Sequence, residues 1–242
     1  MAVADTPGAT MTEERRIEAE IPLDATPAEV WDAIATEPGL TAWFAPMDPA
    51  PDENGLSADG VVLRWEPGLG YAIQTETSAF EYLIEEQDDG SSILRFVQTG
   101  FLGDDWEAEY EATARGWDLY FHTLQLYVSG FHGAPATYVV AEGPAWSGTA
   151  EAWQKLREAV GGEVGTKVEL DVYGLGVVVG EVDYDGPSHF GITTEYALLR
   201  FHNRSLLGMP VALGHHYYGP GQDAKRLEDA WQSWLTEFYL TQ

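Results

Sequence analysis

RGWDLYFHTLQLYVSGF, residues 115–131, is the stretch on which the fold of this chain depends most. It contains five aromatic rings and no proline, and its spacing predicts an α-helix. The main apolar stripe of this helix consists of Trp117, Tyr120, Phe121, Leu124, Val128 and Phe131. Leu119 and Leu126, seven residues apart, form a second stripe. A helix that is apolar on more than one face is expected to be covered on more than one face.

The chain has 242 residues, enough for one large domain or two smaller ones. Its 12 Lys and Arg face 40 Asp and Glu, which gives a formal net charge of −28. Such an acidic surface repels phosphate backbones and anionic headgroups, so nucleic-acid and membrane partners are not expected. The absence of cysteine excludes disulfides and thiolate chemistry.

Residues 1–13 show neither the basic start nor the apolar stretch of a signal peptide. They read as a flexible tail. No run of eighteen apolar residues follows, so no membrane-spanning helix is predicted. The expected location is the cytoplasm.

The alternation of apolar residues and the helix-capping residues predict the first structured elements. Residues 17–21 alternate apolar and charged side chains, as a half-buried strand does. Thr26 and Glu29 then form a capping box around Pro27, which marks the start of a helix. Residues 37–39, Glu-Pro-Gly, are expected to break this helix before a short second one that carries Leu40, Trp43 and Phe44.

Four apolar segments separated by Gly or Asp-Gly turns lie between residues 61 and 101, and they predict an antiparallel meander. The long helix is expected to open at Asp104–Asp105, where carboxylates suit its positive end. The remaining chain repeats the order of strand, helix, several strands and helix. Its predicted strands are residues 136–143, 167–173, 176–185, 190–202 and 210–218, and its helices are residues 150–162 and 223–240.

Two pairs of tryptophans support an internal repeat. Trp31 corresponds to Trp153 at an offset of 122, and Trp117 corresponds to Trp231 at an offset of 114. Loop deletions can absorb the difference between these offsets. The alternative is that two amphipathic helices carry tryptophan independently.

The stretch EAEIPLDATPAEVWDAIATEPGLTAWF (18–44), the meander ending ILRFVQTGF (93–101) and the helix opening with Gly116-Trp117 resemble the START-like, or SRPBCC, helix-grip superfamily. The likeness is to the branch of the heat-shock-protein ATPase activator homologues (Aha-type), and it covers about residues 15–131. It implies an α+β fold in which a curved antiparallel sheet wraps a long C-terminal helix around a cavity. The predicted domains are residues 14–132 and a second, divergent helix-grip domain at residues 133–242.

Motifs for catalysis or cofactors are not evident. GLGVVVG at 174–180 has the wrong glycine spacing for a dinucleotide site and leads into a strand, so it predicts a hairpin. His215 and His216 would point to opposite faces of a strand and cannot chelate one metal together. No serine lies in a nucleophile elbow. We therefore predict no catalytic residue, no metal and no cofactor.

Pocket candidates follow from the meander and the long helix, because ligand cavities are mostly apolar and aromatic. They are Trp43, Trp65, Tyr71, Tyr82, Arg95, Trp117, Tyr120 and Phe121. Arg95 would anchor an acidic ligand if its face of the strand is interior. If Leu94 and Phe96 face inward instead, Arg95 is a surface residue.

The resemblance implies binding of an apolar or weakly acidic small molecule in a cavity of roughly 300 to 1,000 Å³ within the first repeat. One alternative is a cyclase, aromatase or dehydratase that uses a buried Tyr, His or carboxylate. Another is a protein-interaction module of the co-chaperone kind. In each case Leu119 and Leu126 are interface candidates, facing either the second repeat or a second copy in a homodimer.

Overall fold

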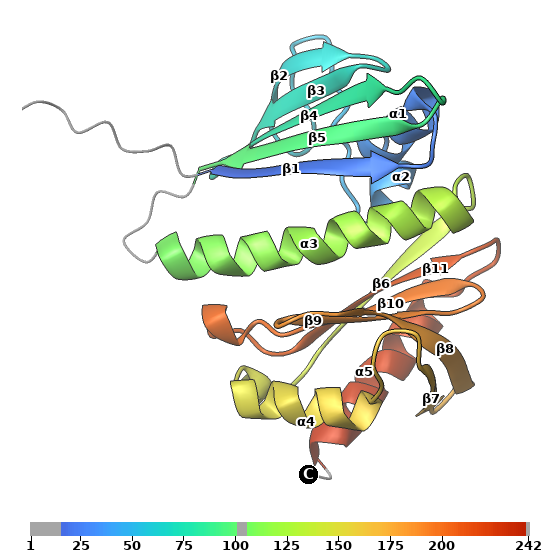
Figure 1. Cartoon of the computed structure of the whole chain (residues 1–242). Coiled ribbons are helices and arrows are strands. Elements are labelled where there is room, and N and C mark those ends of the chain that lie inside the picture. Colours follow the sequence, from blue (N-terminus) through green and yellow to red (C-terminus); the bar gives the residue numbers. More distant parts are fainter. Residues whose placement is uncertain (1–15, 101–105, 241–242) are drawn as a thin grey trace, which may run out of the picture.

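The computed structural model describes residues 16–100 and 106–240 (Figure 1). The predicted tail at residues 1–13 and the predicted helix start at Asp104–Asp105 lie outside the described residues. The molecule has two antiparallel sheets, and the long helix α3 (Trp106–Gly130) lies between them. No described helix combines the length and apolar character needed to cross a bilayer.

The first half has the predicted helix-grip topology. Its elements before α3 are β1 (Arg16–Leu23), α1 (Pro27–Ala35), α2 (Glu37–Thr41), β2 (Val61–Glu66), β3 (Gly70–Gln74), β4 (Ala79–Glu86) and β5 (Ser92–Thr99). The sheet order is β1-β5-β4-β3-β2, so the first strand pairs with the last strand of the meander. One face of this sheet packs on α3, and α1 and α2 lie at one end (Figure 1).

The short helices show the predicted capping, with one shift in position. The Thr26 N–H donates to Glu29 Oε2 at 2.8 Å, and the Thr26 hydroxyl accepts from the Glu29 N–H. The prediction that residues 37–39 break the helix is wrong, because Thr36 ends α1 and its hydroxyl caps α2 by accepting the Gly39 N–H at 3.0 Å. Gly39 packs so closely on α1 that a Cβ there would lie 2.0 Å from the Asp32 carbonyl oxygen.

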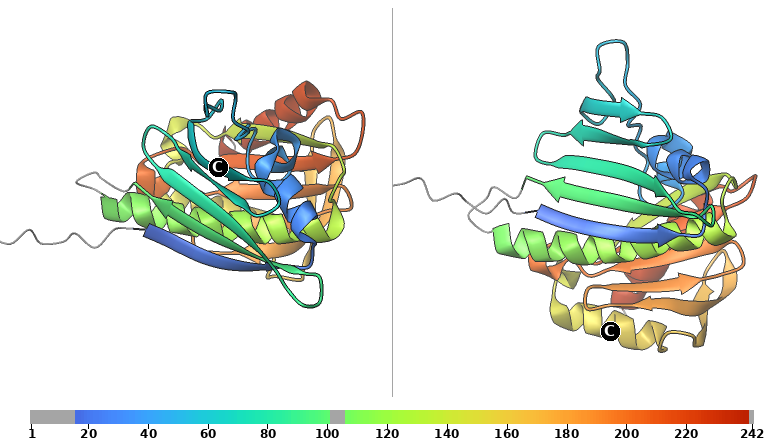
Figure 2. Two further views of the ribbon diagram at one scale, coloured as in Figure 1. Left: turned by 90° about the horizontal axis from the view of Figure 1, so that it is seen from above. Right: turned by 45° about the horizontal axis from the view of Figure 1, so that its top comes forward.

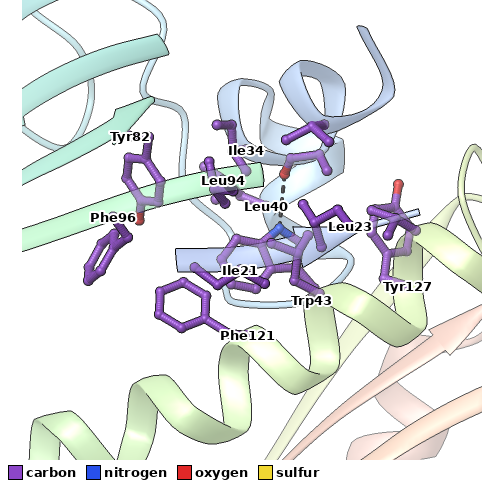
Figure 3. Close-up of a cluster of buried hydrophobic side chains, with 14 of the residues drawn as sticks. Ile21, Leu23, Ile34, Leu40, Trp43, Tyr82, Leu94, Phe96, Phe121 and Tyr127 are labelled. Carbon is purple, nitrogen blue, oxygen red and sulfur yellow. Dashed lines mark hydrogen bonds between the residues drawn. The ribbon is translucent and has the colours of Figure 1, made fainter. Parts of the chain in front are cut away.

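The core of the first half lies between its sheet, α1, α2 and α3 (Figure 3). Leu94 and Phe96 point inward from β5, and Phe121 meets them from α3. Trp43 is fully buried, and its indole N–H donates to the Ala33 carbonyl of α1 at 2.9 Å. This one side chain therefore joins the helical end of the fold to the core.

The second half has the same topology with one more strand. Its elements are β6 (Ala136–Glu142), the 3-10 turn η1 (Ala145–Ser147), α4 (Ala150–Val160), β7 (Lys167–Val172), β8 (Gly176–Asp185), β9 (His189–Thr193), β10 (Ala197–His202), the 3-10 turn η2 (Ser205–Leu207), β11 (Ala212–Tyr218) and α5 (Ala224–Leu240). The sheet order is β6-β11-β10-β9-β8-β7, so again the first strand pairs with the last.

The single strand predicted at residues 190–202 is in fact the hairpin of β9 and β10. The turn contains neither glycine nor proline, so no typical turn residue marks it in the sequence. Thr194 closes the turn: its N–H donates to the Ala197 carbonyl at 2.8 Å, and its hydroxyl accepts the Tyr196 N–H at 3.2 Å. A threonine hydroxyl thus replaces the usual turn residues.

The tryptophans proposed as repeat anchors occupy equivalent elements. Trp31 is in α1 and Trp153 is in α4, each in the helix that follows the first strand of its half. Trp117 is in α3 and Trp231 is in α5, the helices that close each half. The repeated architecture is thus present, and a common origin of the halves stays a prediction.

The second sheet is covered on both faces, by α3 on one and by α4 and α5 on the other (Figures 1 and 2). Every residue of β10 is consequently buried. Phe201 faces α5, where it contacts Trp234, and Arg200 faces α3. His215 and His216 point to opposite faces as predicted: the His215 ring lies 4.5 Å from Trp231, and His216 Nδ1 donates to the Thr41 carbonyl at 3.0 Å.

Candidate ligand-binding site

The cavity expected between sheet and helix in the first half is small, at about 210 Å³. Three of the predicted pocket residues, Tyr71, Tyr82 and Trp117, line it. Aromatic rings fill most of the remaining space, since Tyr71 and Tyr82 stack at 4.8 Å and Phe96 lies 4.3 Å from Trp117. The volume is below the roughly 300 Å³ at which ligand pockets usually begin.

A larger cavity of about 430 Å³ lies where α3 meets both sheets, and we call it the interface pocket. Phe44, Phe80 and Trp117 line both this pocket and the smaller cavity, so they form the wall between the two. Phe44 and Trp117 stack at 5.2 Å with an interplanar angle of 11°. The apolar side of the interface pocket is therefore an aromatic surface.

Gly116 of α3 gives the pocket part of its width. A Cβ at this position would meet only the Tyr120 ring, at 3.7 Å. Any longer side chain would extend into the pocket that Gly116 lines. The glycine that sequence reasoning treated as a fold position thus also lines the site.

The polar side of the pocket includes two histidines and two tyrosines, together with Gln98, Thr113, Glu142, Ser188, Asn203 and Arg204. His189 of β9 and His202 of β10 are direct cross-strand partners, and their rings make an edge contact at 5.2 Å. Tyr138 reaches the same region from β6 and Tyr120 from α3. Gly214 leaves room for the Tyr138 and His202 side chains, because a Cβ at Gly214 would lie 2.9 Å from the Tyr138 hydroxyl and 3.1 Å from His202 Nε2.

These four side chains are not held by other groups. Their ring nitrogens and hydroxyls make no hydrogen bond to any residue that the structure describes. His189 is 7% exposed and His202 is 9% exposed. Tyr120 and Tyr138 are half-buried, and all four residues line the pocket, so their free polar groups are open to water or to a molecule inside it.

Burial also fixes the protonation states. It lowers the pKa of His189 to about 4, with the positive charge of Arg115 acting in the same direction. Burial and neighbouring cationic groups lower the pKa of His202 well below 6.5. The pKa values of Tyr120 and Tyr138 are raised by burial. At neutral pH the pocket therefore presents uncharged imidazoles and uncharged hydroxyls.

The two arginines near the pocket are already paired. Arg204 forms an ion pair with Glu142, and its Nε donates to the Pro210 carbonyl at 2.8 Å. Arg115 pairs with Glu111 and donates from Nη1 to the Ser188 hydroxyl at 3.0 Å. Arg204 also lines the pocket, and its Nη1 makes no hydrogen bond to any residue that the structure describes.

A buried polar network beside the pocket holds α3 to the second sheet. Arg200 of β10, 1% exposed, donates from Nε to the Thr123 hydroxyl at 2.8 Å and from Nη1 to Asp183 Oδ1 at 2.9 Å. His122 of α3 approaches Asp183 Oδ2 at 2.9 Å. Burial would raise the pKa of Asp183, but Arg200 and His122 together hold it below its ordinary value.

The other predicted pocket residues lie elsewhere. Trp43 and Phe121 are buried core residues, and Trp65 packs against Trp31 and Tyr71 without lining either cavity. Tyr120 does line the interface pocket. The structure thus divides the predicted set between the two cavities and the core.

Arg95 as a pocket residue is wrong. Successive side chains of a strand point to opposite faces, and Leu94 and Phe96 occupy the inner face of β5. Arg95 lies on the outer face, where it pairs with Glu20 at 3.0 Å and with Glu85 at 2.8 Å. It is a surface residue on the side away from both cavities.

The two interface candidates, Leu119 and Leu126, lie on α3. Leu119 is fully buried, one turn from Arg115 and Thr123, which bond to residues of the second half. Leu126 is half-buried beside the first core. Within residues 16–100 and 106–240, no group of three or more His, Asp or Glu side chains is placed to hold a metal ion.

Sequence reasoning missed His189, His202 and Tyr138. The only local signal is for His202, which ends a strand, residues 197–202, that is apolar apart from Arg200; His189 and Tyr138 have none. A strand buried on both faces that nevertheless carries histidine places a polar group inside the molecule. The sequence of the strand itself does not show which helix covers that polar group.

The buried histidines predict a loss of stability in mild acid. The ordinary histidine pKa is 6.5, whereas that of His189 is about 4 and that of His216 about 3 in the fold. Between these values the unfolded chain takes up protons that the folded chain does not, so stability falls as pH decreases below 6.5. The slope is about 1.4 kcal/mol per pH unit for each such histidine. Thermal unfolding at pH 7.5 and 5.5 measures it.

His189→Phe is the matched variant, since it keeps a ring but cannot take up a proton. It is expected to show a smaller drop of the unfolding midpoint between the two pH values than the wild type. Equal midpoints of the wild-type protein at pH 7.5 and 5.5 would contradict the burial argument.

Comparisons with known proteins give a likeness of fold. No protein-family model matches the chain, and no curated protein matches it. An AHSA1-like protein from Rhizobium etli, solved by NMR, matches with 22% identity over 50% of this chain and 86% of its own, at a TM-score of 0.41. CalU16 from Micromonospora echinospora matches with 22% identity over 48% of this chain and 74% of its own, at a TM-score of 0.37.

A third solved structure spans both halves. DynU16, a protein of the dynemicin biosynthetic locus, matches with 13% identity over 93% of this chain and 96% of its own, at a TM-score of 0.40. Identities and scores at this level say nothing about ligand or reaction. The strand order of each half carries the conclusion on fold. The chain is an α+β protein of the START-like, helix-grip fold, and in each of its two sheets the first strand pairs with the last.

Proposed function

We propose that this protein binds a largely apolar small molecule in the interface pocket. The observation that supports this is a cavity of about 430 Å³ with an aromatic wall on one side and four unpartnered polar groups on the other. Ligand pockets typically combine an apolar lining with a few polar groups that fix orientation. The smaller cavity of about 210 Å³ would then serve at most as an extension behind Phe44, Phe80 and Trp117.

Gly116→Leu is the sharpest test of this proposal. Its side chain extends into the pocket and should abolish binding, while leucine in place of glycine favours the helix by up to about 1 kcal/mol. The measurement is native mass spectrometry of the purified protein, which detects a co-purifying molecule. The wild type is expected to carry an added mass that Gly116→Leu lacks.

Gly116→Ala is the control, because a single Cβ fits at ordinary contact distance from Tyr120. It should keep the ligand. If wild type and Gly116→Leu carry the same added mass, the ligand lies outside the interface pocket. If none carries one, a thermal-shift screen of apolar molecules on wild type and Gly116→Leu decides between pocket binding and no binding.

A second candidate function is acid–base catalysis of the cyclase or dehydratase kind. It is favoured by His202 Nε2 and the Tyr138 hydroxyl, which approach the same point above Gly214 and are both free. An uncharged imidazole can accept a proton while a phenol donates one. If the protein is such an enzyme, the molecule bound to purified His202→Gln is unreacted substrate. It then differs from the molecule bound to the wild type. Identical bound masses would speak for binding alone.

A further inference from the structure

A further surface pocket, of about 410 Å³, lies between α5 and the hairpin of β7 and β8. We call it the outer pocket, and it is lined by Asp171, Tyr173, Trp234, Glu237 and Phe238. Because α5 covers the face of the second sheet opposite to α3 (Figure 1), the outer pocket and the interface pocket have no lining residue in common. A ligand of the outer pocket would therefore be additional to the proposed function.

One wall of the outer pocket consists of two rings on successive turns of α5. Trp234 and Phe238 are four residues apart, and their rings stack at 6.1 Å with an interplanar angle of 19°. Toward the core, the Trp234 ring makes edge contacts with Trp231 at 5.5 Å and with Phe201 at 6.4 Å. These contacts fix the inner side of the wall, while its half-buried rings leave their other side to the pocket.

Tyr173 supplies a third ring from the turn between β7 and β8. Its side chain is 86% exposed, whereas tyrosine is ordinarily at least partly buried. The turn itself is held in place: the Leu175 N–H donates to the Val172 carbonyl at 2.9 Å, and Arg226 of α5 donates from Nη2 to the Gly174 carbonyl at 2.6 Å. The backbone beneath the exposed ring is thus anchored to the same helix that carries the other two rings.

The charged groups of the outer pocket are negative. Asp171 of β7 and Glu237 of α5 are exposed and line it, and none of the described lining residues is Lys, Arg or His. The Asp171 carboxylate forms no ion pair or hydrogen bond with any residue that the structure describes. The faces of aromatic rings are also negative, so rings and carboxylates together attract a cation. The net charge of −28 acts in the same direction.

The groups that line the outer pocket favour one kind of cation. Ca²⁺ and Mg²⁺ take about six or more oxygen ligands, whereas this pocket has only two carboxylates among the residues described. A primary ammonium is strongly hydrated and has three N–H donors that need acceptors. A quaternary ammonium has no N–H, and its methyl groups can contact ring faces while carboxylates balance its charge.

We infer that the outer pocket binds a small molecule that carries a quaternary ammonium group. The rings of Tyr173, Trp234 and Phe238 contact its methyl groups, and Asp171 and Glu237 balance its charge. The volume of about 410 Å³ lies within the usual range of small-molecule pockets.

Three probes with the same hydroxyethyl arm test this inference. Choline carries a trimethylammonium group, neohexyl alcohol carries an uncharged tert-butyl group of the same shape, and ethanolamine carries a primary ammonium. Heteronuclear NMR titration of the full chain at pH 7 gives each dissociation constant from the indole signal of Trp234 and the amide signal of Gly174. Choline is expected to bind at least about threefold more tightly than either of the other probes.

Matched variants locate the binding site. Tyr173→Leu and Asp171→Asn change exposed side chains, and each should weaken choline binding by about 2- to 5-fold. Tyr173→Phe keeps the ring and should bind choline as the wild type does. Glu169→Gln is the control for charge, because Glu169 is exposed on the same face of β7 as Asp171 but does not line the outer pocket. Its effect should be smaller than that of Asp171→Asn.

Several results would overturn the inference. Equal affinities for choline and neohexyl alcohol would mean that the outer pocket is only an apolar surface, and tighter binding of ethanolamine would mean that the rings do not select the cation. Equal effects of Asp171→Asn and Glu169→Gln would show a response to net charge alone. Failure of choline to bind the wild type would also contradict the inference. None of these results affects ligand binding in the interface pocket, which Gly116→Leu tests separately.

Discussion

Arg200→Met is expected to destabilise the protein by about 3–5 kcal/mol, because it removes one partner of a buried ion pair and leaves the carboxylate of Asp183 without its cation. Arg200 is 1% exposed and joins Asp183 of the second half to Thr123 of α3. Urea unfolding followed by tryptophan fluorescence gives the change in unfolding free energy.

Arg95→Met is the matched control. Arg95 also forms ion pairs, but its side chain is 47% exposed on the outer face of β5, so the expected loss is under about 1 kcal/mol. Adding Asp183→Asn to Arg200→Met should restore part of the stability, since no unpaired charge then remains buried. Equal losses for Arg200→Met and Arg95→Met would mean that the buried Arg200–Asp183 pair contributes no more to stability than an exposed ion pair.

Trp43→Ala is the second large effect expected, at about 3–5 kcal/mol. The side chain is fully buried between α1, the first sheet and α3, and it lies 6.5 Å from the Phe121 ring. Its removal leaves a cavity and frees the carbonyl of Ala33 from its hydrogen bond. The same urea titration measures this loss.

Trp43→Phe separates the two contributions, because phenylalanine fills part of the space but cannot donate to Ala33. It should lie between wild type and Trp43→Ala. Trp146→Ala is the surface control, since Trp146 is 54% exposed, and its expected change is within about 0.5 kcal/mol. A loss at Trp146 as large as that at Trp43 would contradict the assignment of Trp43 to the core.

The site shows where prediction from sequence reaches its limit. Tyr71, Tyr82, Trp117 and Tyr120 line cavities, because the meander and the long helix of a helix-grip fold face each other. Arg95 was misplaced for a reason specific to strands. A shift of one residue in the assumed alternation turns every side chain of a strand to the opposite face. Both faces of β5 contain apolar residues.

Local sequence determined the elements of this protein. The capping box at Thr26, the two-residue alternation of the strands and the apolar stripes of the helix at 115–131 act through neighbouring atoms, so they can be recognised without the rest of the chain. The tertiary structure alone decided where the candidate site lies. His189, His202 and Tyr138 come from three strands of the second sheet, and Tyr120 and the aromatic wall join them because α3 lies between the two sheets. The burial that keeps these imidazoles uncharged, and the closure of the pocket, are properties of that packing, which no single segment encodes.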